Sequence, residues 1–207
     1  MKQDIILAGV GGQGIISIAY VIANAALEEG LEVKQAEVHG MSQRGGAVQS
    51  HLRLSRARIW SDLVPRGEAD LVLSVEPLEA LRYIDYLRPE GMIIASRTPF
   101  INIKDYPDIE TLLNKIREIP LHLIIDSEKL AKEAGSSRTQ NMVLLGAAAG
   151  RLMVKEESLA RFIRVLFERH GETIVASNLK AFALGQAVAA AADFGPASGE
   201  KTRRGGG

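Results

Sequence analysis

Two glycine clusters, each placed directly after an apolar run, constrain this chain more than any other feature. They are Gly9-Val10-Gly11-Gly12-Gln13-Gly14 and Gly40-Met41-Ser42-Gln43-Arg44-Gly45-Gly46. Glycine is used where the backbone takes a positive φ or approaches a ligand or another chain closely. Because both clusters follow neighbouring predicted strands, we expect them to outline one surface, which is the candidate site.

The first cluster has the G-x-G-x-x-G spacing. Residues 4–8 before it are predicted as a strand, and residues 15–29 after it as a helix ended by Gly30. This strand, turn and helix form the context that the dinucleotide-binding motif requires. The free N–H groups at the start of such a helix favour phosphate or carboxylate. From the spacing alone, anion binding and a turn that only packs the helix tightly on the sheet are equal alternatives.

Two related sites are excluded by inspection. A Walker A loop places Lys and then Ser or Thr after the last glycine, whereas Ile15 and Ile16 follow Gly14. The second cluster does not form a G-x-S-x-G elbow, because Arg44 stands two positions after Ser42. We therefore interpret Ser42 as a turn or cap residue and expect neither a kinase-like site nor a serine nucleophile.

Four side chains near the predicted strand ends carry polar or charged groups that can bind a ligand or transfer a proton. Arg44 offers a planar fork to carboxylate or phosphate, or pairs with an acidic residue. A histidine such as His39 beside a glycine turn more often hydrogen-bonds backbone than catalyses. Glu37 is placed to contact a ribose in a dinucleotide binder. Glu76 is interpreted as a first-turn acidic residue favoured by the helix dipole.

The remaining periodicity alternates between strand and helix, which predicts one Rossmann-like α/β domain over residues 1–192. Its sheet is expected to be mostly parallel, with helices on both faces and a helical C-terminal part. Further strands are predicted at 31–38, 47–54, 70–75, 91–95 and 121–125, with a short return strand at 57–60. Helices are predicted at 78–87, 109–118, 127–134 (beginning at Ser127), 141–153, 156–169 and 172–192, and a loop at 98–106. Residues 193–207 are rich in Gly, Pro, Ser and charge, which predicts a disordered tail.

Composition limits the function classes. The chain has 25 basic and 25 acidic residues. Its net charge is therefore zero, and there is no overall electrostatic attraction to nucleic acid or to an acidic membrane. It has no cysteine, and its four histidines show no metal-ligand spacing. Residues 5–27 carry no charge, but their glycines and strand-then-helix periodicity indicate buried structure rather than a membrane span. A cytoplasmic subunit is expected.

The two clusters together resemble the gamma-type domain of 2-oxoacid:ferredoxin oxidoreductases. The resemblance covers residues 1 to about 192 and includes Thr139-Gln140-Asn141-Met142-Val143-Leu144-Leu145-Gly146, which opens a later helix. Within this family the chain is most similar to the beta subunit of indolepyruvate ferredoxin oxidoreductase. Relatives acting on pyruvate or 2-oxoglutarate usually carry an aromatic residue where His39 stands.

The resemblance implies a complex that decarboxylates an aryl 2-oxo acid on thiamine pyrophosphate. Electrons then pass through [4Fe-4S] clusters to ferredoxin, and the acyl group goes to coenzyme A. This chain lacks both cysteine and the thiamine signature of Gly-Asp-Gly followed by Asn-Asn, so a larger alpha subunit is expected to hold these cofactors. The role implied here is architectural, with a share in coenzyme A binding and no catalytic or metal-binding residue. The expected binding residues are Gly9, Gly11, Gly12, Gln13, Gly14, Arg44, Gly45 and Gly46, with N–H groups of the first loop and the charge of Arg44 directed to phosphate.

Two other function classes stay open. A free-standing NAD(P)-dependent oxidoreductase would use the same loop with Glu37, although no Tyr is followed four residues later by Lys. A purely structural subunit would dock its glycine loops on a partner and bind no small molecule. A homodimer of the isolated chain is expected if surface meant for the partner is left exposed.

Overall fold

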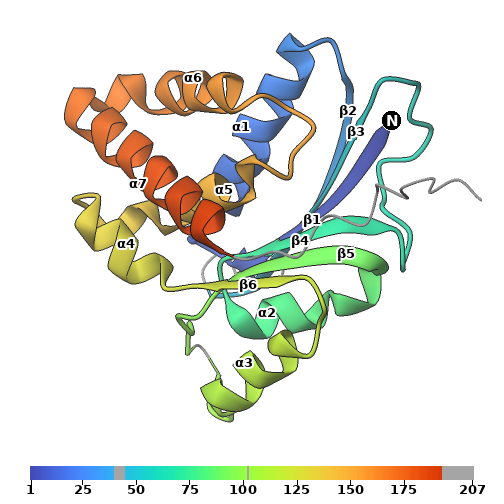
Figure 1. Ribbon diagram of the computed structural model, residues 1–207, viewed down its shortest axis with the longest axis vertical. Coiled ribbons are helices and arrows are strands. Elements are labelled where there is room, and N and C mark those ends of the chain that lie inside the picture. The colour runs from blue at the N-terminus through green and yellow to red at the C-terminus, as the bar shows by residue number, and fades with distance from the viewer. Residues whose placement is uncertain (40–44, 102, 193–207) are drawn as a thin grey trace, which may run out of the picture.

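The computed structural model, shown in Figure 1, describes residues 1–39, 45–101 and 103–192. The strands are β1 (Lys2–Val10), β2 (Glu32–His39), β3 (Ala47–Ser55), β4 (Ala69–Ser74), β5 (Leu87–Ser96) and β6 (His122–Ile125). The helices are α1 (Ile15–Glu28), α2 (Pro77–Arg82), α3 (Ile109–Arg117), α4 (Ser127–Glu133), α5 (Gln140–Ala149), α6 (Glu156–Phe167) and α7 (Glu172–Ala191). Short 3-10 turns, η1 to η3, occupy Ile84–Tyr86, Ser137–Thr139 and Glu168–His170. The predicted tail at 193–207 lies outside the described residues.

The six strands form one sheet in the order β2-β3-β1-β4-β5-β6. β1, β4, β5 and β6 pair in parallel, whereas β3 runs antiparallel to both of its neighbours, β1 and β2. The link from β2 to β3 spans only residues 40–46, and a parallel crossover needs about a dozen residues or more. The mostly parallel sheet is therefore confirmed, with β3 reversed because its connection is short.

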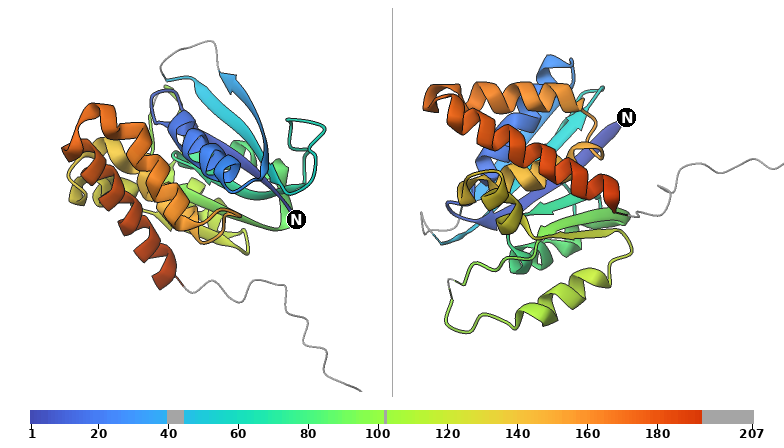
Figure 2. Two further views of the ribbon diagram at one scale, coloured as in Figure 1. Left: turned by 90° about the horizontal axis from the view of Figure 1, so that it is seen from above. Right: turned by 60° about the vertical axis from the view of Figure 1, so that its left-hand side comes forward.

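Helices cover both faces of the sheet, as predicted. α2 and α3 lie on one face, and α1 with α4 to α7 lie on the other (Figures 1 and 2). The alternation within β1 follows this division: Ile5 and Leu7 join the larger core, and Ile6 joins the smaller core with residues of α2 and α3. Because successive strand side chains point to opposite faces, β1 is buried on both sides.

α5 and α7 pack with almost no space between their backbones. A side chain at Gly146 would run into the Phe182 carbonyl, and one at Gly185 into the Val143 carbonyl. Within the described residues, α7 is the one helix long and apolar enough to cross a membrane by length and composition. Core helices pass the same test, so this finding is weak evidence, and the expected absence of a membrane role stays a prediction.

Several local predictions differ from the structure, among them the helix predicted at 141–153, which ends at Ala149. Residues 57–60 are not a strand, because β3 is already paired on both sides and the Ile59 N–H instead donates to Glu32 Oε1 at 3.0 Å. α4 is capped by Asp126, whose side chain accepts from the Lys129 N–H, while Ser127 is buried inside its first turn. The helix predicted at 78–87 ends at Arg82, and β5 begins at Leu87.

Candidate functional site

The first glycine cluster forms a tight turn between β1 and α1. Gly12 and Gly14 have φ of 99° and 77°, in the left-handed region that favours glycine. The Gln13 side chain folds back on the turn, and its Oε1 accepts from the Val10 N–H at 2.8 Å. Gly9 permits close packing, because a Cβ there would lie 2.7 Å from Ile15 Cδ1. Gly9 and Gln13 thus shape the loop from within.

The two glycine clusters meet directly. The Gly11 N–H donates to the Gly46 carbonyl at 2.8 Å, and the Gly45 N–H donates to the Gly11 carbonyl at 3.5 Å. The contact arises because the second cluster precedes β3, whose first residue pairs with Val10 at the end of β1. Arg44 and Ser42 lie outside the described residues, so the predicted phosphate contact of Arg44 stays a prediction.

Two of the four predicted backbone donors are already hydrogen-bonded within the chain. The N–H groups of Gly11 and Gln13 are occupied, by the Gly46 and Val10 carbonyls. For the N–H groups of Gly12 and Gly14, the described part of the chain supplies no acceptor. They lie at the start of α1, where the helix carries partial positive charge. The donors available to an anion are therefore those of Gly12 and Gly14.

A cavity of about 350 Å³ opens beside the glycine loop at Gly12 and Gln13. It lies where β1, β4 and β5 end, and ligands of open α/β sheets gather at such carboxyl ends. Its lining is Gly12, Gln13, Val75, Phe100, Ser137, Arg138 and Gln140. Arg138, in η2, is the one charged residue of that lining. The cavity is thus suited to an anion.

The segment that carries Arg138 is fixed to the glycine loop. Asn141 is buried, and its Nδ2 donates to the Gly14 carbonyl at 3.2 Å. Ser127 Oγ donates to Gln140 Oε1 at 3.2 Å and shares a 2.8 Å hydrogen bond with Ser96 Oγ. In the sequence, residues 139–146 are noted as part of the family resemblance and as the start of the helix predicted at 141–153. Arg138 is not predicted, because no local pattern indicates that η2 lies beside a loop formed far earlier in the chain.

Glu76 holds the Phe100 wall of the cavity. Its side chain caps α2 by accepting from the Glu79 N–H, which agrees with its interpretation as an acidic residue at a helix start. The same buried carboxylate accepts from the Phe100 N–H at 3.3 Å and from the Tyr106 hydroxyl. Burial, and next the hydrogen bond to Glu76, raise the pKa of Tyr106. Tyr106 therefore stays a neutral hydrogen-bond donor over the physiological range.

Glu37 lies away from the glycine loop. It is on β2, opposite Ser50 of β3, and β3 separates β2 from β1. In a dinucleotide-binding fold the strand that carries the acidic residue is the direct neighbour of β1. Here the inserted antiparallel strand removes that geometry, which weighs against the nicotinamide-dependent alternative.

Comparison with known proteins agrees with this geometry. The family described as Pyruvate ferredoxin/flavodoxin oxidoreductase matches residues 4–188. The chain is 37% identical to the indolepyruvate oxidoreductase subunit IorB of Thermococcus kodakarensis, covering 89% of this chain and 95% of that protein. It is 38% identical to the IorB subunit of Pyrococcus horikoshii over the same shares of the two chains.

Two solved structures share the fold. One is a 2-oxoglutarate:ferredoxin oxidoreductase from Magnetococcus marinus with 2-oxoglutarate, coenzyme A and succinyl-CoA bound. The TM-score is 0.74 at 28% identity, over 92% of this chain and 31% of that one. The other is the gamma subunit of a keto/oxoacid ferredoxin oxidoreductase from Geobacter sulfurreducens, with a TM-score of 0.66 at 25% identity, over 92% and 99% of the two chains.

The chain belongs to the pyruvate ferredoxin/flavodoxin oxidoreductase family. Within that family it is a small subunit of a 2-oxoacid:ferredoxin oxidoreductase, and its relatives of similar length are subunits of such enzymes. The expected fold class and family resemblance are both confirmed.

Proposed function

We propose that this chain is the cofactor-poor subunit of an oxidoreductase acting on indolepyruvate or another aryl 2-oxo acid. The identity to IorB subunits supports this substrate class. The cofactors are assigned to a larger alpha subunit, which would hold thiamine pyrophosphate and [4Fe-4S] clusters and pass electrons to ferredoxin. This chain's residues do not fit a cluster, since it has no cysteine. The proposal places the complex in the cytoplasm.

We further propose that the cavity at the glycine loop holds a phosphate group of coenzyme A. The observation that carries this is that Gly12, whose N–H has no acceptor in the described part of the chain, lines one cavity together with Arg138, and that the free N–H of Gly14 lies two residues further along the same loop. Backbone donors at a helix start and a guanidinium together suit phosphate oxygens. The related Magnetococcus marinus structure has coenzyme A bound, which supports the choice of ligand. Gly45 and Gly46 support the loop, and Arg44 remains a second proposed contact.

Titration of the assembled complex with coenzyme A tests this site. We expect Arg138→Ala to weaken coenzyme A binding about tenfold or more, because a hydrogen bond to a charged group contributes roughly 1.5 to 3 kcal/mol. Arg169→Ala is the matched control, since Arg169 is exposed at η3 and does not line the cavity. Equal coenzyme A affinity in wild type and Arg138→Ala would refute the site.

The same titrations separate the remaining alternatives. NADH binding by the isolated chain, lost in Gly12 or Gly14 variants, would favour a free-standing dehydrogenase. An assembled complex whose coenzyme A affinity does not respond to any change at the loop would favour a structural subunit.

A further inference from the structure

The loop at residues 56–68, between β3 and β4, presents a large apolar side chain to solvent. It lies at the amino end of the parallel strands, opposite the cavity at the glycine loop. Trp60, the only tryptophan of the chain, is 82% exposed, and Leu63 is 52% exposed. Tryptophan is enriched among the few residues that carry most of the binding energy at protein interfaces.

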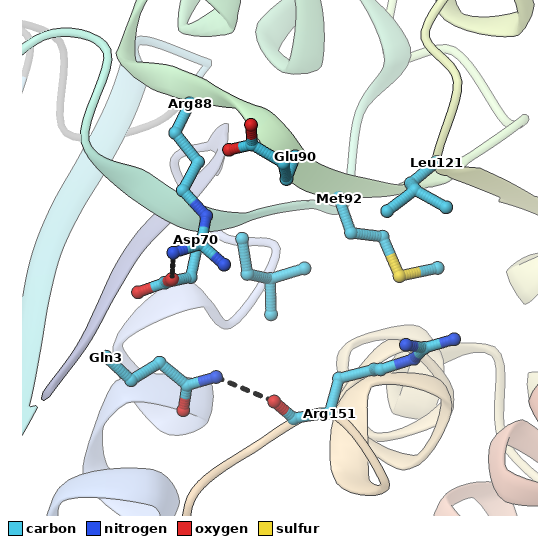
Figure 3. Close-up of a pocket in the computed structure, with 8 residues that line it drawn as sticks. Gln3, Asp70, Arg88, Glu90, Met92, Leu121 and Arg151 are labelled. Atoms are coloured by element: carbon cyan, nitrogen blue, oxygen red, sulfur yellow. Dashed lines mark hydrogen bonds and ion pairs between the residues drawn. The ribbon is translucent and has the colours of Figure 1, made fainter. Parts of the chain in front are cut away.

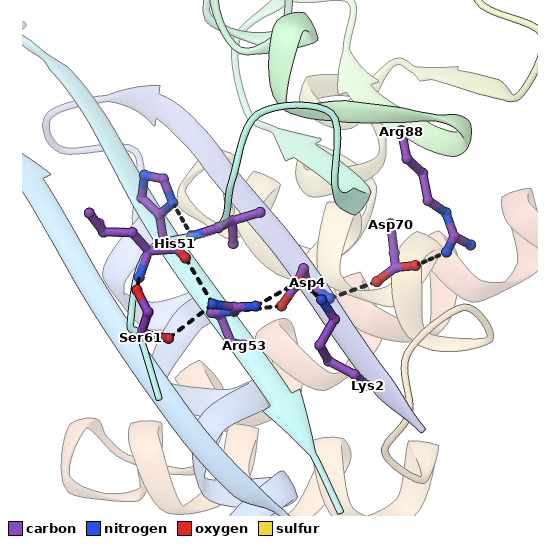
Figure 4. Close-up of polar contacts among 9 residues, drawn as sticks. Lys2, Asp4, His51, Arg53, Ser61, Asp70 and Arg88 are labelled. Atoms are coloured by element: carbon purple, nitrogen blue, oxygen red, sulfur yellow. Dashed lines mark hydrogen bonds and ion pairs between the residues drawn. The ribbon is translucent and has the colours of Figure 1, made fainter. Parts of the chain in front are cut away.

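This loop has no helix or strand, yet it is anchored along its length. Buried Arg53 donates from Nη1 to the Ser61 and Leu63 carbonyls at 3.0 and 2.9 Å, and from Nε to Asp4 Oδ1 at 2.8 Å (Figure 4). The Val64 N–H donates to His51 Nδ1 at 3.0 Å.

Buried side chains flank the exposed ones along the loop. Ile59 and Val64 are buried on either side of Trp60 and Leu63, so the chain turns inward before and after the exposed pair. The backbone around Trp60 is held by buried polar contacts rather than by packing of the indole itself. A surface fixed in this way loses little conformational entropy when a partner covers it.

The charge around Trp60 indicates what such a partner presents. The Arg58 guanidinium carbon lies 4.1 Å from the centre of the Trp60 ring. No carboxylate in the described part of the chain forms an ion pair with Arg58, Arg56 or Arg66, although Asp62 and Glu68 lie on the same loop. A guanidinium stacked on an aromatic face keeps its N–H edge free for a carboxylate.

A second copy of this chain fits the surface around Trp60 and Arg58 less well than a partner that presents carboxylates. Its apolar cavity between α2 and α3, about 510 Å³, is edged by Arg82 and Lys115 together with Glu118. The larger cavity at the amino end of the sheet, about 630 Å³, is edged by Arg88 and Arg151 as well as Asp70 and Glu90 (Figure 3). Basic side chains stand among the carboxylates at both cavities, so neither offers Arg58 a rim of carboxylates alone.

We propose that Trp60, Leu63 and Arg58 form a docking surface for a partner subunit that presents an apolar socket edged by carboxylates. Trp60 and Leu63 enter the socket, and Arg58 pairs with a carboxylate at its rim. This inference rests on the proposed function, because it requires a partner subunit.

Fluorine NMR of the assembled complex tests the docking surface. Because Trp60 is the only tryptophan, the chain labelled with 5-fluorotryptophan gives a single resonance. The probe is the unlabelled subunit that co-purifies in stoichiometric amount with the tagged chain. We expect the resonance to shift and to lose its response to a soluble paramagnetic quencher when that subunit is added. An unchanged, quencher-accessible resonance in a complex that has formed would overturn the proposal.

Variants measure the contribution of each side chain. Trp60→Ala is expected to weaken the complex at least tenfold, as hot-spot tryptophans do, and to leave thermal unfolding of the isolated chain unchanged. Arg58→Glu is expected to weaken it by a similar factor, most strongly at low salt, while Arg169→Glu on the far side has little effect.

Wild-type affinity in Trp60→Ala, or a homodimer that forms through Trp60, would contradict the proposal. Failure to recover any partner contradicts the proposed function instead.

Discussion

The Gly11 N–H donates a 2.8 Å hydrogen bond to the carbonyl oxygen of Gly46, joining the two glycine clusters that stand far apart in the sequence. The bond forms because β3 runs antiparallel to β1 and begins where β1 ends. It uses the Gly11 N–H internally, whereas the N–H groups of Gly12, which lines the cavity, and Gly14 have no acceptor in the described part of the chain. The candidate site thus depends on the one reversed strand of the sheet.

Alanine at Gly14 is expected to destabilise the chain by about 3 kcal/mol. Part of this is the left-handed backbone, which costs a side chain roughly 1 to 2 kcal/mol, and the rest is collision with Asn141. Gly30→Ala is the matched control, since Gly30 has φ of 75° but no atom near its missing Cβ. Urea unfolding of both variants measures the difference. Equal losses would show that the Asn141 contact contributes nothing.

Alanine at Gly146 is expected to cost more than 3 kcal/mol. A Cβ there meets the Phe182 backbone of α7, and backbone cannot move aside as a side-chain tip can. Gly150 ends α5 with a negative φ and only a 3.7 Å neighbour, so Gly150→Ala should change stability by less than about 1 kcal/mol. Thermal unfolding of the two variants tests this, and a stable Gly146→Ala chain would refute the close α5 to α7 packing.

Periodicity and glycine spacing predict most of the fold, because each reports on local burial and turns. The strand, turn and helix around Gly9 to Gly14 and the helix end at Gly30 are confirmed within a residue or two. The antiparallel direction of β3 follows from the short link at 40–46, which is too short for a parallel crossover. Residues 57–60 resemble a strand by composition, and only the pairing of β3 on both sides excludes one.

The site was predicted less completely than the fold. The glycine pattern identifies the loop, but it does not show that Gly11 and Gln13 use their N–H groups internally. Arg138 and the Phe100 wall come from distant segments brought together by the sheet order. Such long-range proximity leaves no signal in the local pattern of one sequence.

Removing the Tyr106 hydroxyl is expected to loosen the loop that carries Phe100. Tyr106→Phe removes a hydrogen-bond donor from the buried side chain of Glu76, and leaving a buried acceptor without its donor costs about 1 to 3 kcal/mol. Hydrogen exchange at the Phe100 N–H should become faster in this variant, and coenzyme A affinity of the complex should fall. Tyr20→Phe on the exposed face of α1 is the control. Unchanged exchange at Phe100 would show that Glu76 does not hold this loop.

Stability is expected to fall as pH rises through the titration of Glu79. Burial chiefly raises the pKa of Glu79 to about 7 from 4.5, with Arg82 opposing and Glu76 adding to the shift. Between these two pH values the folded chain binds more protons at Glu79 than the unfolded chain, so the free energy of unfolding decreases with increasing pH. Its buried Oε2 has no hydrogen-bond partner in the described residues, which is consistent with the neutral form.

The variant Glu79→Gln isolates this effect. It should be more stable than wild type by about 1 to 3 kcal/mol near pH 8 and nearly equal near pH 5. Glu118→Gln, at an exposed glutamate, controls for the loss of one carboxylate. Urea unfolding at several pH values gives the comparison, and a difference between Glu79→Gln and wild type that does not vary with pH would contradict the raised pKa.

Purification of the tagged chain from its source cells tests the central claim most directly. What co-purifies is to be identified by mass spectrometry and assayed for iron and thiamine. We predict a stoichiometric, cysteine-rich larger subunit carrying both, since this chain has no cysteine of its own. Recovery of the chain alone, free of iron and thiamine and binding a nicotinamide nucleotide, would contradict the assignment as a cofactor-poor subunit.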